Sequence, residues 1–181
     1  MNLWHDIPVG DGAPREVNAI IEIPNGSHNK YEIDKKTGLI KLDRANYSSA
    51  PYPFDYGFVP QTLWDDDDAL DIVVLSTHPL LPGILVVVRP VAILSMIDGG
   101  DADHKVIGVP VEDRRFDDVR DLKDLNAHTL KEYVHFFETY KNLKGKPVTV
   151  EIGGYKGASD AQKAVTRSMA LYAKKFGPKK V

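Results

Sequence analysis

The order of the apolar patterns along the chain constrains the fold more than any other feature of this sequence. Short strand-like runs fill the first two-thirds, and two amphipathic helical patterns appear only near the end. A doubly wound parallel sheet needs strands and helices in regular alternation, and that alternation is missing here. The pattern therefore predicts a mainly β fold, a small barrel or curled sheet with helices packed outside it.

The predicted strands are short apolar or alternating runs bounded by turn residues. Pro24-Asn25-Gly26 closes the first of them, and Pro82-Gly83 precedes the longest. Pro90 interrupts that longest run, which indicates either a bulge or an edge position. The predicted strand segments are residues 19–23, 30–33, 39–42, 71–75, 84–94, 106–109 and 147–152.

Two helices are predicted near the end of the chain. The first covers about residues 130–143, where apolar positions and Lys141 recur at spacings of 4, 3 and 4. The second has a stripe of small and apolar residues from Ala161 to Tyr172. Ser159 followed by Gln162 predicts a capping box at its start, and Gly177-Pro178 predicts its end.

Length, charge and composition exclude several classes of protein. The 181 residues favour one domain, residues 1–181, and the net charge of −3 offers no basic field for nucleic acid or an anionic membrane. Cysteine is absent, which excludes disulfides, zinc–thiolate sites and thiol nucleophiles. The longest apolar run, residues 84–88, is too short to cross a membrane, and the first residues lack a secretory signal pattern. We therefore expect a soluble cytoplasmic protein.

An acidic segment precedes the predicted strand 71–75. Five of the seven positions from Asp65 to Asp71 are aspartates. In an extended backbone Asp66 and Asp68 share a face and Asp71 points the other way, so a turn or bulge near Ala69 is needed to bring all three together. Taken alone, the segment is at least as typical of a solvated surface loop as of a metal site.

A second acidic cluster makes the metal interpretation stronger. Asp98-Gly99-Gly100-Asp101-Ala102-Asp103 follows a strongly apolar strand, and its glycines permit a bend that turns Asp98 and Asp103 toward one point. The available ligands are oxygen atoms, which favour Mg²⁺ or Mn²⁺ over zinc or copper. A calcium EF-hand fits badly, because the required glycine would fall on Asp71.

Scattered cations, tyrosines and one strand glutamate complete the candidate set. Each cation alone is typical of an ordinary surface charge, and each tyrosine alone is typical of core or turn packing. Glu22 stands between Ile21 and Ile23, and an acid in an apolar strand needs a partner. The residues concerned are Lys30, Arg44, Lys105, Lys141, Tyr52, Tyr56, Tyr140 and Glu22.

In this order, the residues resemble the soluble family I inorganic pyrophosphatases of the prokaryotic type. Seven separated blocks carry the resemblance and span about two-thirds of the chain. They are Ile20-Ile21-Glu22-Ile23-Pro24, Lys30-Tyr31-Glu32-Ile33, Asp43-Arg44, Tyr52-Pro53 with Tyr56-Gly57, Asp66-Asp67-Asp68-Ala69-Leu70-Asp71, Asp98 with Asp103-His104-Lys105, and His135-Phe136-Phe137-Glu138 with Tyr140-Lys141.

The resemblance implies a five-stranded OB-like barrel flanked by two α-helices. It implies Mg²⁺-dependent hydrolysis of inorganic pyrophosphate to two phosphates by a homo-oligomer, expected to be a hexamer, with no nucleic acid or membrane partner. It makes Asp68 the general base and gives supporting roles to Glu22, Glu32 and Tyr52. The implied metal ligands are Asp66, Asp71, Asp98 and Asp103, and the implied phosphate-binding residues are Lys30, Arg44, Tyr56, Lys105, Tyr140 and Lys141.

The sequence departs from the family pattern at two positions. Ala69 stands where the motif carries proline or glutamate, so we expect a less stiff loop. Gly99 stands where bacterial members carry a glutamate, so a metal-supporting carboxylate is not expected there. Neither departure removes a group that the reaction requires.

Two other functions compete with this interpretation. A broader metal-dependent phosphohydrolase would act on nucleotides or phosphate esters, and comparing phosphate release from different substrates separates it from a pyrophosphatase. An OB-type nucleic-acid-binding module would need exposed aromatic residues beside a basic groove, whereas the densest charge here is acidic.

Overall fold

A closed ring of five strands forms the centre of the computed structural model, which describes residues 1–145 and 149–177. The five strands are β1 (Val17–Ile23), β4 (Asp55–Phe58), β5 (Asp71–Val74), β6 (Leu85–Asp98) and β8 (Lys105–Pro110). Hydrogen bonds join β1 to β4, β4 to β5, β5 to β8, β8 to β6, and β6 back to β1. Only β5 and β8 run parallel.

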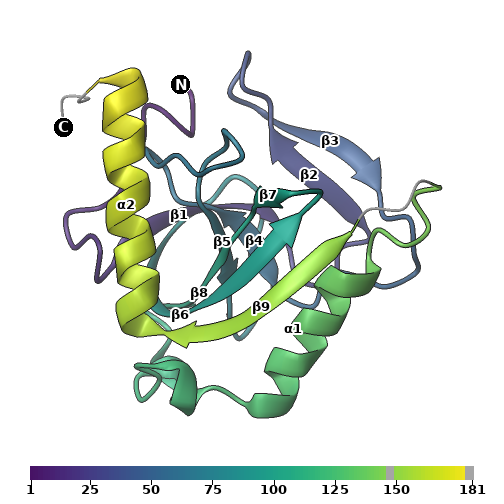
Figure 1. Cartoon of the computed structure of the whole chain (residues 1–181). Helices are drawn as coiled ribbons and strands as arrows, with labels where there is room; N and C mark the ends of the chain where they lie inside the picture. The colour runs from purple at the N-terminus through teal and green to yellow at the C-terminus, as the bar shows by residue number, and fades with distance from the viewer. Residues whose placement is uncertain (146–148, 178–181) are drawn as a thin grey trace.

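The remaining elements surround this ring, as Figure 1 shows. They are β2 (Asn29–Ile33), β3 (Ile40–Ala45), β7 (Asp101–Ala102), η1 (Arg114–Phe116), η2 (Leu122–Asp124), α1 (Ala127–Thr139), β9 (Val150–Gly157) and α2 (Ala158–Phe176). Strands β2 and β3 form a separate two-stranded sheet, while β7 and β9 extend β6 outside the ring. Helices α1 and α2 lie outside the strands, so the predicted fold class, mainly β with two flanking helices, is confirmed.

Each helix packs one apolar face against the strands. Helix α1 buries Tyr133, Phe136 and Phe137 in a core that includes Phe54. The ring centroids of Phe54 and Tyr133 lie 4.9 Å apart in an edge-to-face arrangement. Helix α2 buries small residues and Val165 against a second core lined by β1, β5 and β6. Burial of each large apolar side chain contributes about 1.5–3 kcal/mol, so these faces hold both helices in place.

The first predicted helix has the wrong bounds. Helix α1 begins three residues before the predicted start, because the side chain of Asn126 caps it and accepts hydrogen bonds from the backbone of His128 at 2.9 Å and Thr129 at 3.1 Å. It ends at Thr139, so Lys141 lies in the turn beyond it. The polar cap, which the apolar spacing did not include, sets the start of the helix.

The capping box predicted from Ser159 and Gln162 is wrong. The N-cap of α2 is Gly157, whose lack of a side chain leaves the first turn without a cap of its own. Asp121, in the distant loop before η2, accepts a hydrogen bond from the backbone N–H of Ala158 at 2.8 Å. The helix ends as predicted at Gly177, where φ is +80°, while Pro178 lies outside the described residues.

Two strand predictions are refined by the pairing of β6. The bulge predicted from Pro90 is confirmed, since the register with β8 shifts between Pro90 and Ala92. The alternative, an edge position, holds only locally: β6 as a whole pairs on both sides, but Pro90 lies between the end of its pairing with β1 at Val88 and the start of its pairing with β9 at Ala92. Strand β9 begins at Val150 and extends five residues beyond the predicted end, and residues 147–148 of that prediction lie outside the described residues.

Strand β4 was not predicted, although it is fully buried between β1 and β5. Prolines at 51 and 53 precede it and give the segment the pattern of a turn. Gly57 allows β4 to approach β1 closely, because a Cβ atom there would lie 1.9 Å from the carbonyl oxygen of Ile20. Within the described residues, no helix combines the length and apolar character needed to span a membrane.

Candidate active site

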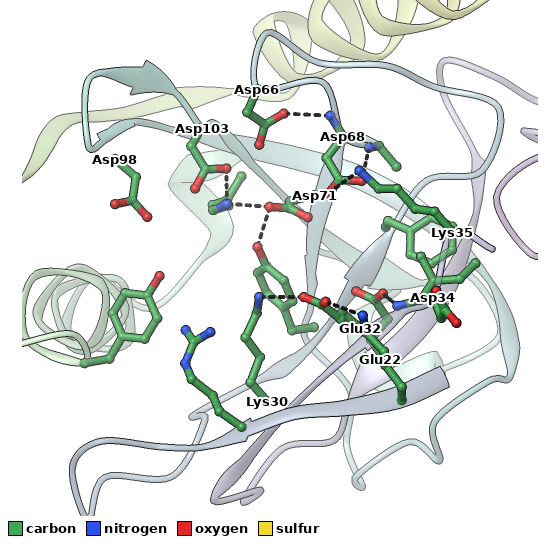
Figure 2. Close-up of a pocket in the computed structure, with 18 of the residues that line it drawn as sticks. Glu22, Lys30, Glu32, Asp34, Lys35, Asp66, Asp68, Asp71, Asp98 and Asp103 are labelled. Atoms are coloured by element: carbon green, nitrogen blue, oxygen red, sulfur yellow. Dashed lines mark hydrogen bonds and ion pairs between the residues drawn. The ribbon is translucent and has the colours of Figure 1, made fainter. Parts of the chain in front are cut away.

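A pocket of about 470 Å³ lies between the β2–β3 sheet and one end of the five-stranded ring. Every residue that the sequence analysis named as a catalytic, phosphate-binding or metal-binding candidate lines it. These residues are Lys30, Arg44, Tyr56, Asp66, Asp68, Asp71, Asp98, Asp103, Lys105, Tyr140 and Lys141. In Figure 2 one side of the pocket carries Asp66, Asp68, Asp71, Asp98 and Asp103, and the other carries Lys30, Glu32 and Asp34.

A tight turn at residues 65–68, called here the acidic loop, brings three of the aspartates together. The backbone N–H of Trp64 donates to the carbonyl oxygen of Asp68 at 2.7 Å, and Asp67 has a left-handed φ of +65°. The N–H of Asp68 donates to Asp66 Oδ1 at 3.1 Å. The turn places Asp66 and Asp68 beside Asp71, the first residue of β5. The predicted reversal is present, but it is centred within the acidic loop and not at Ala69.

A glycine hairpin delivers the second pair of aspartates. Gly99 and Gly100 have φ values of +62° and +100°, which favour glycine, and they join β6 to β7. Asp98 ends β6 and Asp103 follows β7, so both side chains reach the same pocket. A glutamate at position 99 would be strained in this conformation.

Lys105 is the most buried cation of the pocket, with a side chain only 3% exposed. Its Nζ donates to Asp71 Oδ2 at 2.5 Å and also to Asp103. Burial alone would lower the pKa of Lys105, yet the two carboxylates raise it above its usual value. Tyr56 donates its hydroxyl to the same Asp71 oxygen at 2.5 Å, and burial followed by the Asp71 charge raises the pKa of this phenol well above 10.

Other lysines form ion pairs with three further pocket carboxylates, those of Asp98, Asp68 and Glu32. Lys141 forms an ion pair with Asp98, and Lys35 Nζ lies 3.2 Å from Asp68. On the β2–β3 side, Lys30 lies 3.2 Å from Glu32. Arg44 and Lys30 both contact Asp43, which lies beside the pocket.

Asp66 and Asp103 show the electrostatic character of the aspartate side. Burial, followed by the charge of Asp71, raises the pKa of Asp66 to about 6. Burial also raises the pKa of Asp103, although Lys105 opposes the shift. A nearby cation would favour the charged form of both carboxylates.

The donor set fits a hard divalent cation, because it consists of carboxylate oxygens. In residues 1–145 and 149–177, however, no three acidic or histidine side chains already surround one point as a formed metal site. Asp71 and Asp103 direct oxygen atoms at Lys105, and Asp98 directs one at Lys141. The pocket therefore offers the oxygen donors that a hard divalent cation requires, and it holds them close to one another.

Glu22, an acidic residue in an apolar strand, has a backbone hydrogen-bond partner in the structure. Its side chain is buried, and Oε1 accepts a hydrogen bond from the backbone N–H of Ile33 at 2.6 Å. Burial is the main cause that raises its pKa to about 8. This contact ties β1 of the ring to β2, the strand that carries Lys30.

The tyrosines that sequence analysis grouped together have different surroundings. Tyr140 lines the pocket and stacks on Phe136 with ring centroids 5.2 Å apart. Tyr52 is 3% exposed and packs on Phe136 at 4.9 Å and on Phe54 at 6.2 Å. Tyr52 therefore belongs to the aromatic core, where it also contacts the ring of Tyr56 at 6.2 Å.

Sequence analysis missed several charged pocket residues. Residues 35–38 fall between the predicted strand segments 30–33 and 39–42, and Lys35 of this connection lines the pocket beside Asp68. No local pattern separates such a lysine from a solvated turn residue, since its partner is more than thirty positions away. The pocket residues missed in this way are Asp34, Lys35, Lys36, Lys41 and Lys144.

Comparison with known proteins gives one consistent result. A family model described as inorganic pyrophosphatase matches residues 19–173. The inorganic pyrophosphatase of Geobacillus stearothermophilus is 51% identical over 156 residues, which cover 86% of this chain and 93% of that protein. The inorganic pyrophosphatase of Haloferax volcanii is 45% identical over 177 residues, which cover 97% of this chain and 99% of that protein.

A solved structure agrees with these relatives in fold. The crystal structure of inorganic pyrophosphatase from Thermus thermophilus superimposes with a TM-score of 0.92 at 47% sequence identity. The match covers 95% of this chain and 99% of that one. The likeness therefore includes the ring, both helices and the strands that line the pocket.

Proposed function

Because this chain belongs to the inorganic pyrophosphatase family and is an inorganic diphosphatase, we propose that its pocket is the site where pyrophosphate is hydrolysed. The reaction requires Mg²⁺, and Asp68 is the general base. The observation that carries the proposal is that one pocket of about 470 Å³ gathers several cations with the aspartates Asp66, Asp68, Asp71, Asp98 and Asp103. The aspartates come from the acidic loop, β5 and the β6–β8 region, so only the folded chain brings them together.

Four aspartates are the proposed Mg²⁺ ligands: Asp66, Asp71, Asp98 and Asp103. Oxygen-only donors and the raised pKa values of Asp66 and Asp103 support this assignment. When bound, Mg²⁺ neutralises phosphate oxygens and lowers the pKa of a coordinated water. The chain's own part is to keep these carboxylates together despite their mutual repulsion, with Lys105 and Lys141 as counter-charges.

Asp68 differs from the proposed ligands in its surroundings. Its Oδ1 accepts a hydrogen bond from the backbone N–H of Ala69 at 3.0 Å, which orients the carboxylate toward the pocket. Its only ion-pair partner among the described residues is the exposed Lys35. A carboxylate held in this way can accept the proton of an attacking water.

Cations and phenols supply the proposed contacts to the phosphate groups. Lys30 of β2 and Arg44 of β3 both line the pocket, and Figure 2 shows Lys30 across from the aspartates of the ring side. Arg44 can bind a phosphate through two parallel hydrogen bonds. Tyr56 and Tyr140 keep their protons, because burial raises both pKa values well above 10, and so they can donate hydrogen bonds to an anion. Lys105 and Lys141 complete the set. Positive groups fixed in this way stabilise charge that develops on the departing phosphate.

Phosphate release from three substrates tests the proposal. The purified protein is assayed with pyrophosphate, ATP and p-nitrophenyl phosphate, each with and without added Mg²⁺. We expect release from pyrophosphate to exceed the other two and to require Mg²⁺. A preference for the ester would support the broader phosphohydrolase, and salt-sensitive binding to single-stranded nucleic acid without phosphate release would support the OB-type binding module.

A homo-oligomer, specifically a hexamer, and a cytoplasmic location complete the proposal, and both rest on the sequence resemblance. Light scattering after size-exclusion chromatography tests the assembly. A particle with six times the mass of one chain is expected, and a monomer at micromolar concentration contradicts it.

A further inference from the structure

The acidic loop divides its aspartates between two directions. Asp66 and Asp68 line the pocket. Asp65 and Asp67, which alternate with them in the sequence, form ion pairs with helix α2 instead. We propose that Arg167 of α2 is a positioning residue that holds the acidic loop from outside so that Asp66 and Asp68 face the pocket. The proposal rests on the function assigned above to these two aspartates.

Two ion pairs connect the acidic loop to α2. Arg167 Nη2 lies 2.6 Å from Asp65 Oδ1, and Lys175 Nζ lies 2.7 Å from Asp67 Oδ1. The partners are separated by 102 and 108 residues in the sequence. Eight residues of helix advance by about 12 Å, so the two cations contact the loop from well-separated points along α2.

Arg167 also contacts the residue that closes the turn. Its guanidinium carbon lies 4.6 Å from the ring centroid of Trp64, a side chain only 7% exposed. The backbone N–H of Trp64 donates to Asp68, and its carbonyl accepts from Asp67. Trp64 therefore joins both sides of the acidic loop, and Arg167 holds the loop at Trp64 and at Asp65.

Two further observations indicate that this attachment is built into the fold. The N–H of Leu63 donates to the carbonyl oxygen of Ser168 at 3.0 Å, so the backbone leading into the loop is bonded to α2. Trp64 Nε1 is buried without a hydrogen-bond partner in the part of the chain that the structure describes. The indole instead makes ring contacts, with the Arg167 guanidinium over its face and with the His104 ring at 5.4 Å between centroids.

Substitution of Arg167 should change Mg²⁺ binding at the site more than it changes the free energy of unfolding. The side chains of Arg167 and Asp65 are 48% and 40% exposed, and ion pairs with such exposure add little to folding stability. The positive charge of Arg167, however, neutralises Asp65 on the side of the loop that faces α2. This reduces the electrostatic repulsion among the four consecutive aspartates at 65–68. The loop can then keep Asp66 and Asp68 on the pocket side before a metal binds.

Calorimetric titration with MgCl2 alone tests the proposal on the full chain. Arg167→Gln removes the charge and the guanidinium, and Arg167→Lys keeps the charge but loses the planar group over Trp64. We expect R167Q to weaken Mg²⁺ binding about tenfold, as loss of an outer support typically does, and R167K to restore part of it. Asp65→Asn should give a loss similar to R167Q, and the double variant should be no worse than either single one.

Lys163→Gln is the matched control, because Lys163 lies on the same helix and pairs with exposed Asp160 at 3.2 Å. It should bind Mg²⁺ like the wild type. Unchanged Mg²⁺ affinity in R167Q overturns the proposal, and so does a lowered Tm with wild-type affinity in the folded protein. Independently, a wild-type chain that releases no phosphate from pyrophosphate refutes the proposed function, whatever R167Q does to Mg²⁺ binding.

Discussion

Asp71 and Lys105 are paired in register as the first residues of the parallel strands β5 and β8, and Lys105 Nζ lies 2.5 Å from Asp71 Oδ2. Neighbouring strands thus deliver opposite charges to one point at the end of the ring. The same lysine contacts Asp103, so one buried cation balances two carboxylates. This arrangement makes the pocket dependent on Lys105 for stability as well as for phosphate binding.

Lys105→Met should destabilise the protein by about 3 kcal/mol, since removing one partner of a buried ion pair leaves uncompensated charge. Urea unfolding without divalent cations measures the loss. Added Mg²⁺ should recover more stability in K105M than in the wild type, because a cation would again balance Asp71 and Asp103. Lys144→Met, which removes an exposed pocket lysine, is the control and should change stability by less than about 0.5 kcal/mol.

Glu22→Gln should change how stability depends on pH. Below pH 4.5 Glu22 is protonated in both the folded and the unfolded chain. Between pH 4.5 and about 8 the unfolded chain releases this proton while the folded chain retains it, so the free energy of unfolding falls as pH rises. Above about pH 8 the loss is complete, on the order of a few kcal/mol.

Glutamine does not titrate and keeps an oxygen that can accept the hydrogen bond from Ile33. Relative to the wild type, E22Q should therefore gain stability between pH 5 and pH 9. Urea unfolding of both proteins at these two pH values, without divalent cations, checks the expectation. An equal stability difference at both pH values would show that Glu22 ionises normally in the folded chain.

Asp68→Asn and Asp71→Asn should affect different steps. Loss of a general base typically lowers kcat by 10² to 10⁴, so D68N should retain Mg²⁺ binding and lose turnover. D71N removes a proposed ligand and should weaken Mg²⁺ binding first. Calorimetry with MgCl2 and steady-state assays at saturating Mg²⁺ separate the two effects. Wild-type turnover in D68N, or wild-type Mg²⁺ affinity in D71N, contradicts the respective role.

Gly57→Ala should prevent normal pairing of β4 with β1. The new Cβ would lie 1.9 Å from the carbonyl oxygen of Ile20, a backbone atom that cannot rotate away. We expect a loss of more than about 3 kcal/mol, or no folded protein. Gly26→Ala is the comparison, because Gly26 has a φ of +84° with no atom within 4 Å of its Cβ position, so only about 1–2 kcal/mol is lost. Similar thermal unfolding of both variants would contradict this account.

Local patterns in the sequence specify the order of the elements and identify most of the pocket residues. Alternation and helical spacing are local properties, so strands such as β5 and the buried face of α2 follow directly from them. The spaced aspartates and the seven motif blocks likewise named Asp66, Asp71 and Asp103 before any coordinates. Local spacing did not indicate β4, whose burial depends on neighbours from distant segments.

Which charged side chains meet depends on contacts between distant segments of the folded chain. Asp121 caps α2 from 37 residues away, Lys35 contacts Asp68, and Arg167 holds Asp65 across 102 residues. The local sequence around each of these side chains is typical of an ordinary surface charge. Their partners are set by the closure of the ring and the packing of α2, because pairing over such separations is a product of the whole fold and leaves no periodic pattern in the sequence.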